Sequence, residues 1–381
     1  MGSQETPMVL TQETLPEAAG ALPPVEPEQP RLVVFYNPNS TNAREHWEET
    51  KQRLGRLASR AGYLLETVET KQDPEEDREQ VYSSVRKGDV IGAASGDGYL
   101  NRLAEALQRD DAPQHVAEAP ILAVPMGNKS DLANTFNRFG WWNFLGLGWR
   151  RIAKALKERR TVPMYPMVAE FKPDAKPEDS AEGLPASFKK LVVYVLAFGL
   201  TGRGADTINN PAWRKEHQQP ASKALGPIAR IPAVTQAIRL WREVKMVATL
   251  IRESKPIQVG EGSDAYPDSQ QAPSPYIDYS IFNGPRAAGS MHNMIQPYTK
   301  EILISKTRGL VGAAVNLLAR VSHLGFGIWH NGSHTLNLAQ DTPMTFDGEA
   351  FNAPAGQVKV THAEKALNFI TSKRKYWDRR E

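Results

Sequence analysis

The sequence contains no cysteine among its 381 residues. This absence excludes a disulfide-bonded scaffold, a zinc or iron–sulfur site held by thiolates, and a cysteine nucleophile. No apolar run approaches the roughly 18 residues that a helix needs to cross a bilayer. The formal net charge of +3 is close to zero, so the overall charge gives no reason to expect a nucleic acid partner.

Lysine and arginine are missing from residues 1–30, which instead hold six Pro and five Glu. Such a composition buries too little apolar surface to offset the entropy lost on folding, so we expect residues 1–30 to be a disordered acidic tail. The remaining length exceeds what one small hydrophobic core usually organises, and it predicts two domains.

The first half of the chain after the tail alternates short apolar segments with helical patterns, which is typical of an open α/β sheet. Ligands of such sheets gather at the ends of the strands. Polar turns follow three of the predicted strands. The segments expected to be strands are 32–36, 63–68, 89–94 and 121–124.

One of these turns consists of Ser95, Gly96, Asp97 and Gly98, directly before a helical pattern. The two glycines allow backbone N–H groups to close on a phosphate, and the start of a helix adds partial positive charge. Asp97 is the acid that we expect to hold Mg²⁺ against the phosphates. A single Gly-Asp-Gly is also compatible with an ordinary tight turn, so it is weak on its own.

Five segments carry motifs in a fixed order: Asn37-Pro38, 95–98, 125–133, 282–297 and 346–349. Together they resemble the diacylglycerol kinase catalytic family, which includes bacterial diacylglycerol kinases, sphingosine kinases and ceramide kinases. The second segment resembles the family's Gly-Gly-Asp-Gly-Thr motif with Ser in first place. The last matches its Asp-Gly-Glu signature, although the same residues fit an ordinary type I′ hairpin.

The resemblance implies an ATP- and Mg²⁺-dependent kinase that transfers the γ-phosphate to a lipid hydroxyl, on diacylglycerol or a sphingoid-type lipid. It implies Asp347 as the base for that hydroxyl, Glu349 as a group that orients the base or helps to hold metal, and Asp97 in the metal and phosphate role. Family members differ in whether Asp347 or Asp97 is considered the base. The implied nucleotide-binding residues are Asn37, Ser95, Gly96, Asp97, Gly98, Gly127, Asn128, Lys129 and Ser130.

A lipid substrate further implies a cytoplasmic protein that associates peripherally with a membrane surface and has no nucleic acid partner. The motifs do not determine which lipid is phosphorylated, and they do not indicate an oligomeric state.

Two departures from the family pattern keep alternatives open. Lys129 stands where the family has a glycine that lets the backbone approach ATP, and Tyr99 replaces the usual Thr. We favour retained nucleotide binding, because a Lys ammonium is a common phosphate partner. The alternatives are a catalytically weak member that regulates by binding nucleotide or lipid, and an NAD kinase, which has a related Gly-Gly-Asp-Gly loop. The segments 125–133 and 346–349 favour a lipid kinase over an NAD kinase.

Many short strands after an α/β half indicate a β-sandwich. We therefore expect an α/β ATP-binding domain at 31–165, a β-sandwich lipid-binding domain at 166–355, and a C-terminal segment at 356–381 that returns to the first domain. Segment 190–198 is predicted to be one continuous strand. The glycines at 199–204 are spaced like a dinucleotide-binding loop, but we expect no helix after them and assign them no such role.

Two helical patterns combine apolar and basic residues. In 224–252 the apolar spacing predicts packing against the sheet, and the resemblance places this region at the border of a lipid pocket. In 145–157 one apolar face is expected in the core, while the Arg and Lys face is suited to anionic headgroups. That apolar face consists of Leu145, Trp149, Ile152 and Leu156.

Overall fold

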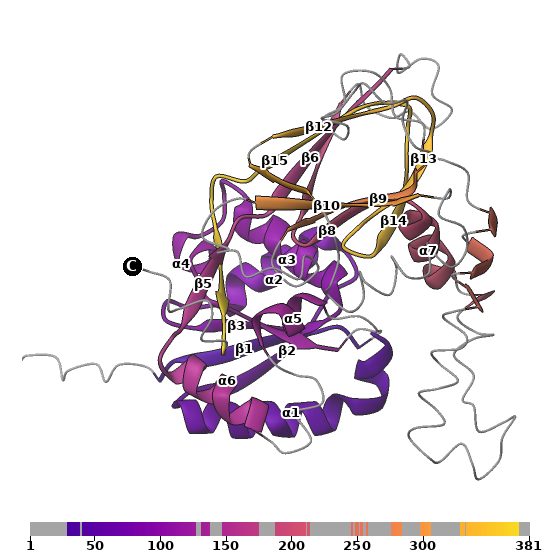
Figure 1. Ribbon diagram of the computed structural model, residues 1–381. Coiled ribbons are helices and arrows are strands. Elements are labelled where there is room, and N and C mark those ends of the chain that lie inside the picture. Colours follow the sequence, from indigo (N-terminus) through magenta and orange to yellow (C-terminus); the bar gives the residue numbers. More distant parts are fainter. Residues whose placement is uncertain are drawn as a thin grey trace, which may run out of the picture.

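The computed structural model of the protein describes most of the first predicted domain and part of the second (Figure 1). The predicted tail lies outside the described residues except for 29–30, and so do the turn 127–130 and most of the predicted helix 224–252. The described residues are 29–38, 40–126, 131–137, 147–174, 187–210, 212–213, 245–246, 248–250, 252–253, 257, 276–283, 298–305, 328–331 and 333–372.

The N-terminal domain is built on a six-stranded sheet in the order β2-β1-β3-β4-β16-β5. All its neighbouring strands are parallel except β5, which runs antiparallel to β16. The strands are β1 (Arg31–Tyr36), β2 (Leu64–Glu69), β3 (Val90–Ser95), β4 (Ile121–Pro125), β5 (Thr161–Met164) and β16 (Leu367–Ile370).

Helices cover both faces of this sheet. α1 and α6 pack together on the face away from the second domain, whereas α2, α3 and α4 lie on the opposite face (Figure 1). The helices are α1 (Thr41–Ala61), α2 (Pro74–Ser84), α3 (Asp97–Gln108), α4 (Gln114–Ala117), α5 (Asp131–Phe136) and α6 (Leu147–Lys157).

Local sequence explains where these helices begin and end. α1 stops at Gly62, which adopts the left-handed conformation with φ 84° and donates its N–H to the carbonyls at the end of the helix. α2 starts after Asp73, whose carboxylate accepts the N–H groups of Glu75 and Glu76, and Pro74 occupies the first helical position. In α6, Ile152 and Leu156 are buried and Trp149 is half-buried, which confirms the predicted core face for the part of it that is described.

The second domain consists of two antiparallel sheets, with orders β11-β10-β9-β8-β13-β14 and β12-β15-β6-β7. Buried side chains of both sheets share one core, so the predicted α/β domain followed by a β-sandwich is confirmed. The strands are β6 (Met167–Pro173), β7 (Phe188–Val192), β8 (Val195–Gly199), β9 (Tyr276–Asn283), β10 (Tyr298–Ser305), β11 (Ile328–Asn331), β12 (His334–Leu338), β13 (Thr342–Phe346), β14 (Glu349–Ala353) and β15 (Gly356–His362).

Two expectations about this domain are wrong. Segment 190–198 is interrupted at Val193 and Tyr194, which separate β7 from β8. A helix does follow the first of the spaced glycines: α7 (Leu200–Asn209) begins directly after β8. Asp278 of β9 fixes its start, since its buried carboxylate accepts the Thr201 N–H at 2.7 Å.

The chain returns to the first domain later than residue 356. β15 still pairs with β6 and β12 in the second domain, and the crossing occurs between His362 and Leu367. β16 then inserts between β4 and β5, where the Phe369 ring stacks on Phe136 with ring centroids 4.2 Å apart. In the described part of the chain, no helix has the length and apolar character needed to span a membrane.

We expect Phe369→Ala to lower the free energy of unfolding by about 3–5 kcal/mol, because it removes a ring that is 1% exposed and leaves a cavity against Phe136. Urea denaturation followed by tryptophan fluorescence measures the change. Leu64→Ala is the control, since Leu64 is 52% exposed and should change stability by about 0.5 kcal/mol or less. Equal effects of the two substitutions would contradict the packing of β16 in this core.

Candidate functional site

Three strand ends form one row at the edge of the first sheet. Tyr36 pairs with Ala94 across β1 and β3, so Asn37 follows beside Ser95. Ser95 in turn pairs with Pro125 across β3 and β4, and the Ser95 carbonyl accepts the Met126 N–H at 3.2 Å. The sheet therefore brings the three predicted polar turns together as far as they are described. Gly127, Asn128, Lys129 and Ser130 continue from Met126 and lie outside the described residues.

The Gly-Asp-Gly turn leads directly from β3 into α3. Ser95 is buried, and its hydroxyl donates to the Gly96 carbonyl at 2.8 Å. Gly96 caps the helix and Asp97 is its first residue. The first N–H groups of a helix have no partner within it, so this start offers donors and partial positive charge at the row of strand ends. The Asp97 side chain lies outside the described part of the structure.

Tyr99 lies in the first turn of α3 but is 7% exposed, so its side chain is part of the core. Burial and the neighbouring Asp77 of α2 raise the pKa of Tyr99 well above its ordinary value, which keeps the phenol neutral. The substitution of the usual Thr by Tyr99 is thus accommodated by packing between α2 and α3.

The Asp-Gly-Glu motif forms the turn of the β13–β14 hairpin. Asp347 and Gly348 both have positive φ, at 50° and 91°, as a type I′ turn requires. The Asp347 carboxylate is buried at 2% exposure and accepts three backbone N–H groups, from Val193 at 2.7 Å, Tyr194 at 2.8 Å and Val195 at 2.9 Å. It therefore occupies the break between β7 and β8.

Burial dominates the electrostatics of this carboxylate. It raises the pKa of Asp347 from 3.8 to about 7, against the three N–H groups, which lower it, and with a smaller contribution from Glu349, which raises it. Asp347 is thus both deeply buried and tied to the backbone, which differs from the free carboxylate that a base for a lipid hydroxyl would present.

Glu349 is the acid of this motif that faces the first domain. It is half-buried at the start of β14. A Cβ added to Gly98 would lie 3.8 Å from Glu349 Oε1 and 3.7 Å from the Asp347 carbonyl oxygen. Two motifs that are some 250 residues apart in the sequence therefore meet, and a Cβ at Gly98 would make only ordinary van der Waals contact with the hairpin.

Sequence reasoning missed two charged residues near this contact, Glu105 and Lys190. Burial raises the pKa of Glu105 of α3, Lys190 of β7 lowers it, and Glu349 raises it. The Lys190 ammonium also lies 5.3 Å from the centroid of the Phe346 ring. A signal existed in the sequence, because Asn101 and Glu105 follow Asp97 at intervals of four residues and so share one stripe of the helix.

We expect the free energy of unfolding to decrease as the pH rises from about 4 to about 7, because of Asp347. Because its folded-state pKa of about 7 lies above the ordinary 3.8, the folded state retains a proton that the unfolded chain has lost in this interval. Asp347→Asn does not titrate and should lack this component, which amounts to at most about 4 kcal/mol.

The measurement is the difference in unfolding free energy between wild type and Asp347→Asn in urea, at pH 4.5 and at pH 8. Asp111→Asn is the control, because the exposed Asp111 has its pKa lowered by Arg109 and titrates below this interval. A difference that stays constant from pH 4.5 to pH 8 would show that Asp347 does not titrate as stated.

Comparison with known proteins bears on the first domain. No curated protein matches the chain. Among solved structures, the chain is similar to a diacylglycerol kinase from Bacillus anthracis str. Sterne, with 13% identity, a TM-score of 0.47, and coverage of 91% of this chain and 98% of that one. It is also similar to an NAD kinase from Archaeoglobus fulgidus in complex with ATP, with 12% identity, a TM-score of 0.41, and coverage of 90% and 95%.

Likenesses at this level of identity and TM-score carry no argument about activity. The family model described as "Diacylglycerol kinase catalytic domain" matches residues 31–161, which include the turn after β1, the Gly-Asp-Gly turn and the segment 125–133. The resemblance inferred from the motifs is thereby confirmed over residues 31–161, where the chain matches the model of this family.

Proposed function

We propose that this protein is an ATP-dependent kinase that transfers the γ-phosphate to the hydroxyl of a lipid of the diacylglycerol or sphingoid class. The observation that carries the proposal is the contact between Gly98, at the start of α3, and the turn formed by Asp347 and Glu349. The N-terminus of a helix, which is suited to bind phosphate, thereby faces a carboxylate that can accept a proton. The match of residues 31–161 to the model of this family supports phosphoryl transfer as the reaction class.

The nucleotide phosphates would bind along the row of strand ends. α3 is 12 residues long and begins there, and Gly96 and Gly98 leave its backbone open to a phosphate. Asn101, one turn further along α3 than Asp97, is 3% exposed, and its Oδ1 has no hydrogen-bond partner among the described residues. A buried polar atom of this kind is normally satisfied, so it fits a site that acquires a ligand or water.

Glu349 is our candidate for the group that accepts the proton of the lipid hydroxyl. It is partly exposed and lies beside Gly98, whereas the Asp347 carboxylate is buried against three N–H groups. Asp347 then acts as a positioning residue, because it fixes the turn that carries Glu349. This proposal reverses the roles that the family resemblance implied for these two acids.

In the proposed reaction, the hydroxyl oxygen of the lipid forms a bond to the γ-phosphorus while the bond from that phosphorus to the β,γ-bridging oxygen breaks. The electron pair of the broken bond leaves with ADP. The hydroxyl proton passes to Glu349, which releases it to water. Little covalent chemistry is required of the protein in such a transfer, so its main contributions are alignment and stabilisation of negative charge.

Mg²⁺ fits the acids available at this contact. Among the residues that the structure describes, no three His, Cys, Asp or Glu side chains gather as metal ligands. Mg²⁺ at kinase sites, however, usually takes only one or two carboxylates together with substrate phosphates. Asp97 would hold it together with the nucleotide phosphates, and when bound it would neutralise charge on the transferring phosphate. Because the acceptor is a lipid, the proposal also places the reaction at a membrane surface.

The test is transfer of labelled γ-phosphate from Mg-ATP to diacylglycerol and sphingosine in mixed micelles. We expect Glu349→Gln to lower kcat by about 100-fold or more while ATP binding changes little, because the substitution removes the proton acceptor but keeps the shape of the side chain. Asp347→Asn should lower activity together with the thermal midpoint, since it loosens the turn. Asp97→Asn should weaken the Mg²⁺ dependence of ATP binding.

Glu364→Gln is the matched control, because Glu364 is an exposed acid of the same region of the chain and should leave the rate unchanged. ATP binding without labelling of any lipid would favour a regulatory nucleotide-binding protein. Phosphorylation of NAD without any lipid product would show that the protein is an NAD kinase.

A further inference from the structure

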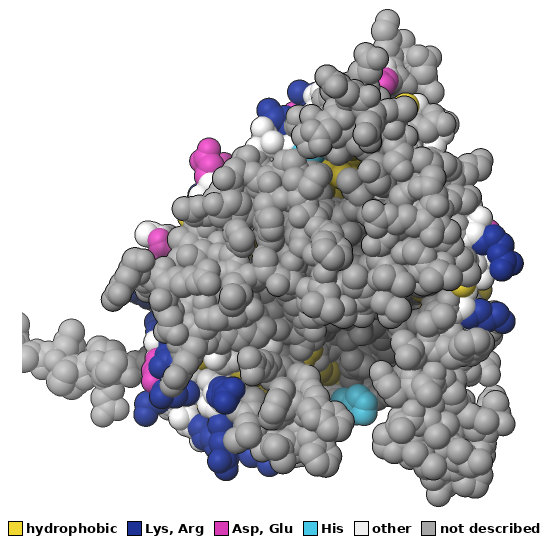
Figure 2. All heavy atoms as spheres, viewed as in Figure 1, with side chains coloured by type: hydrophobic (Ala, Val, Ile, Leu, Met, Phe, Trp, Pro, Cys, Tyr) yellow, Lys and Arg dark blue, Asp and Glu magenta, His cyan; other side chains and the backbone are white. Residues whose placement is uncertain are grey.

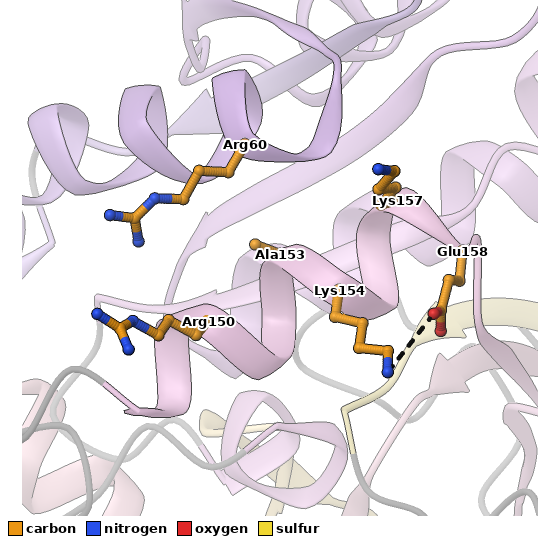
Figure 3. A pocket seen from close by; sticks show the side chains of 6 residues that line it. All are labelled: Arg60, Arg150, Ala153, Lys154, Lys157 and Glu158. Carbon is orange, nitrogen blue, oxygen red and sulfur yellow. Dashed lines mark ion pairs between the residues drawn. The ribbon is translucent and has the colours of Figure 1, made fainter.

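A basic depression lies on the face of the first domain away from the candidate site. It has a volume of about 580 Å³ and is lined by α1 and α6 (Figure 3). Arg60 of α1 and Arg150 of α6 face each other across it, as the close-up shows. Figure 2 shows Lys and Arg side chains gathered over these two helices. The lining residues are Arg60, Arg150, Ala153, Lys154, Lys157 and Glu158.

The cations of this depression are only partly balanced by its own acid. Glu158 lies 3.8 Å from Lys154 and forms a second ion pair with Arg160, so its charge is shared between two partners. Arg60, Arg150 and Lys157 are exposed. The carbonyl ends of α1 and α6 attract some of this positive charge, but that effect is confined to the last turn of each helix, and Arg150 lies in the first turn of α6.

The N-terminal segment of the chain enters the fold at the edge of this depression. The Gln29 side-chain amide donates to the Gly62 carbonyl at 3.3 Å. Gly62 caps the C-terminus of α1, two residues after Arg60. Residues 1–28, which precede this contact, contain Glu5, Glu13, Glu17, Glu26 and Glu28 and no Lys or Arg.

We propose that the acidic segment 1–28 binds in the basic depression between α1 and α6. An extended chain spans about 3.3 Å per residue, so Glu28 and Glu26 lie within about 10 Å of Gln29 and Glu17 within about 40 Å. Because the segment is tethered beside its binding surface, its effective concentration there is in the millimolar range even if each ion pair is weak. The contact does not depend on the proposed kinase activity.

Zero-length carbodiimide cross-linking of the full chain tests this contact directly, because it joins a carboxylate to an amine only when the two groups touch. Trypsin releases residues 1–31 as one peptide, since Arg31 is the first Lys or Arg of the sequence. At low salt we expect this peptide to be joined to Lys154 or Lys157 within the monomer band. At about 0.5 M salt the yield should fall at least about fivefold, because exposed charges are then screened over a few ångströms.

A paired set of variants separates this surface from net charge. Arg60→Gln with Arg150→Gln removes two cations but keeps both reactive lysines, and the cross-link should fall about fivefold or more. Arg109→Gln with Arg252→Gln removes the same charge from exposed positions outside the depression and should leave the yield unchanged. The ion pair of Lys365 with Asp110, at 3.5 Å, serves as the internal standard for the reaction.

Each of the following results would overturn the proposal. The first is a cross-link between Lys365 and Asp110 without any from residues 1–31 to Lys154 or Lys157. The second is an equal loss in the two paired variants, or cross-links confined to a dimer band. The third is absence of the cross-link together with sedimentation on phosphatidylglycerol vesicles that depends on Arg60 and Arg150, which would assign the depression to an anionic membrane surface.

Discussion

The Asp347 carboxylate is the constraint on which the interdomain contact depends. It satisfies the N–H groups of Val193 and Tyr194, which separate β7 from β8, and of Val195, the first residue of β8. Unpaired buried N–H groups would be costly. The same carboxylate holds the β13–β14 turn in a conformation with two positive φ angles. One side chain thus fixes a strand break, a hairpin turn and, two residues later, the position of Glu349 against α3.

The positions of the strand ends could be predicted from local sequence, because the pattern of apolar segments and polar turns in the first half is strong. The register Tyr36 with Ala94 and Ser95 with Pro125 gathers them as expected of a parallel sheet. The motifs also predicted that 95–98 and 346–349 belong to one site. The direction of the Asp347 side chain was not predictable, since its three partners lie some 150 residues earlier in the chain.

Other features escaped prediction for similar reasons. Segment 190–198 is continuously apolar apart from its first residue, so the local sequence does not predict the break at Val193 and Tyr194. The break is stabilised by the carboxylate of Asp347, which is distant in the sequence. α7 carries two glycines that weaken a helix, and it forms because Asp278 caps it and Gly202 fits closely against Met344, where a Cβ would lie 2.5 Å from the backbone. Tertiary contacts outweigh local propensity in both segments.

Because β16 comes from the C-terminal part of the chain, completion of the first sheet depends on the order in which the chain is synthesised. In the sheet that carries the Gly-Asp-Gly turn, the place between β4 and β5 is filled by β16, Leu367–Ile370. During synthesis on a ribosome, which proceeds from the N-terminus, residues 31–164 emerge long before that strand exists. Phe136 and its neighbours must therefore remain exposed, or be shielded by a chaperone, until the β-sandwich has been translated. The first domain therefore cannot be completed as an independent unit of translation, whereas the described strands of the β-sandwich all lie within the continuous stretch 167–362.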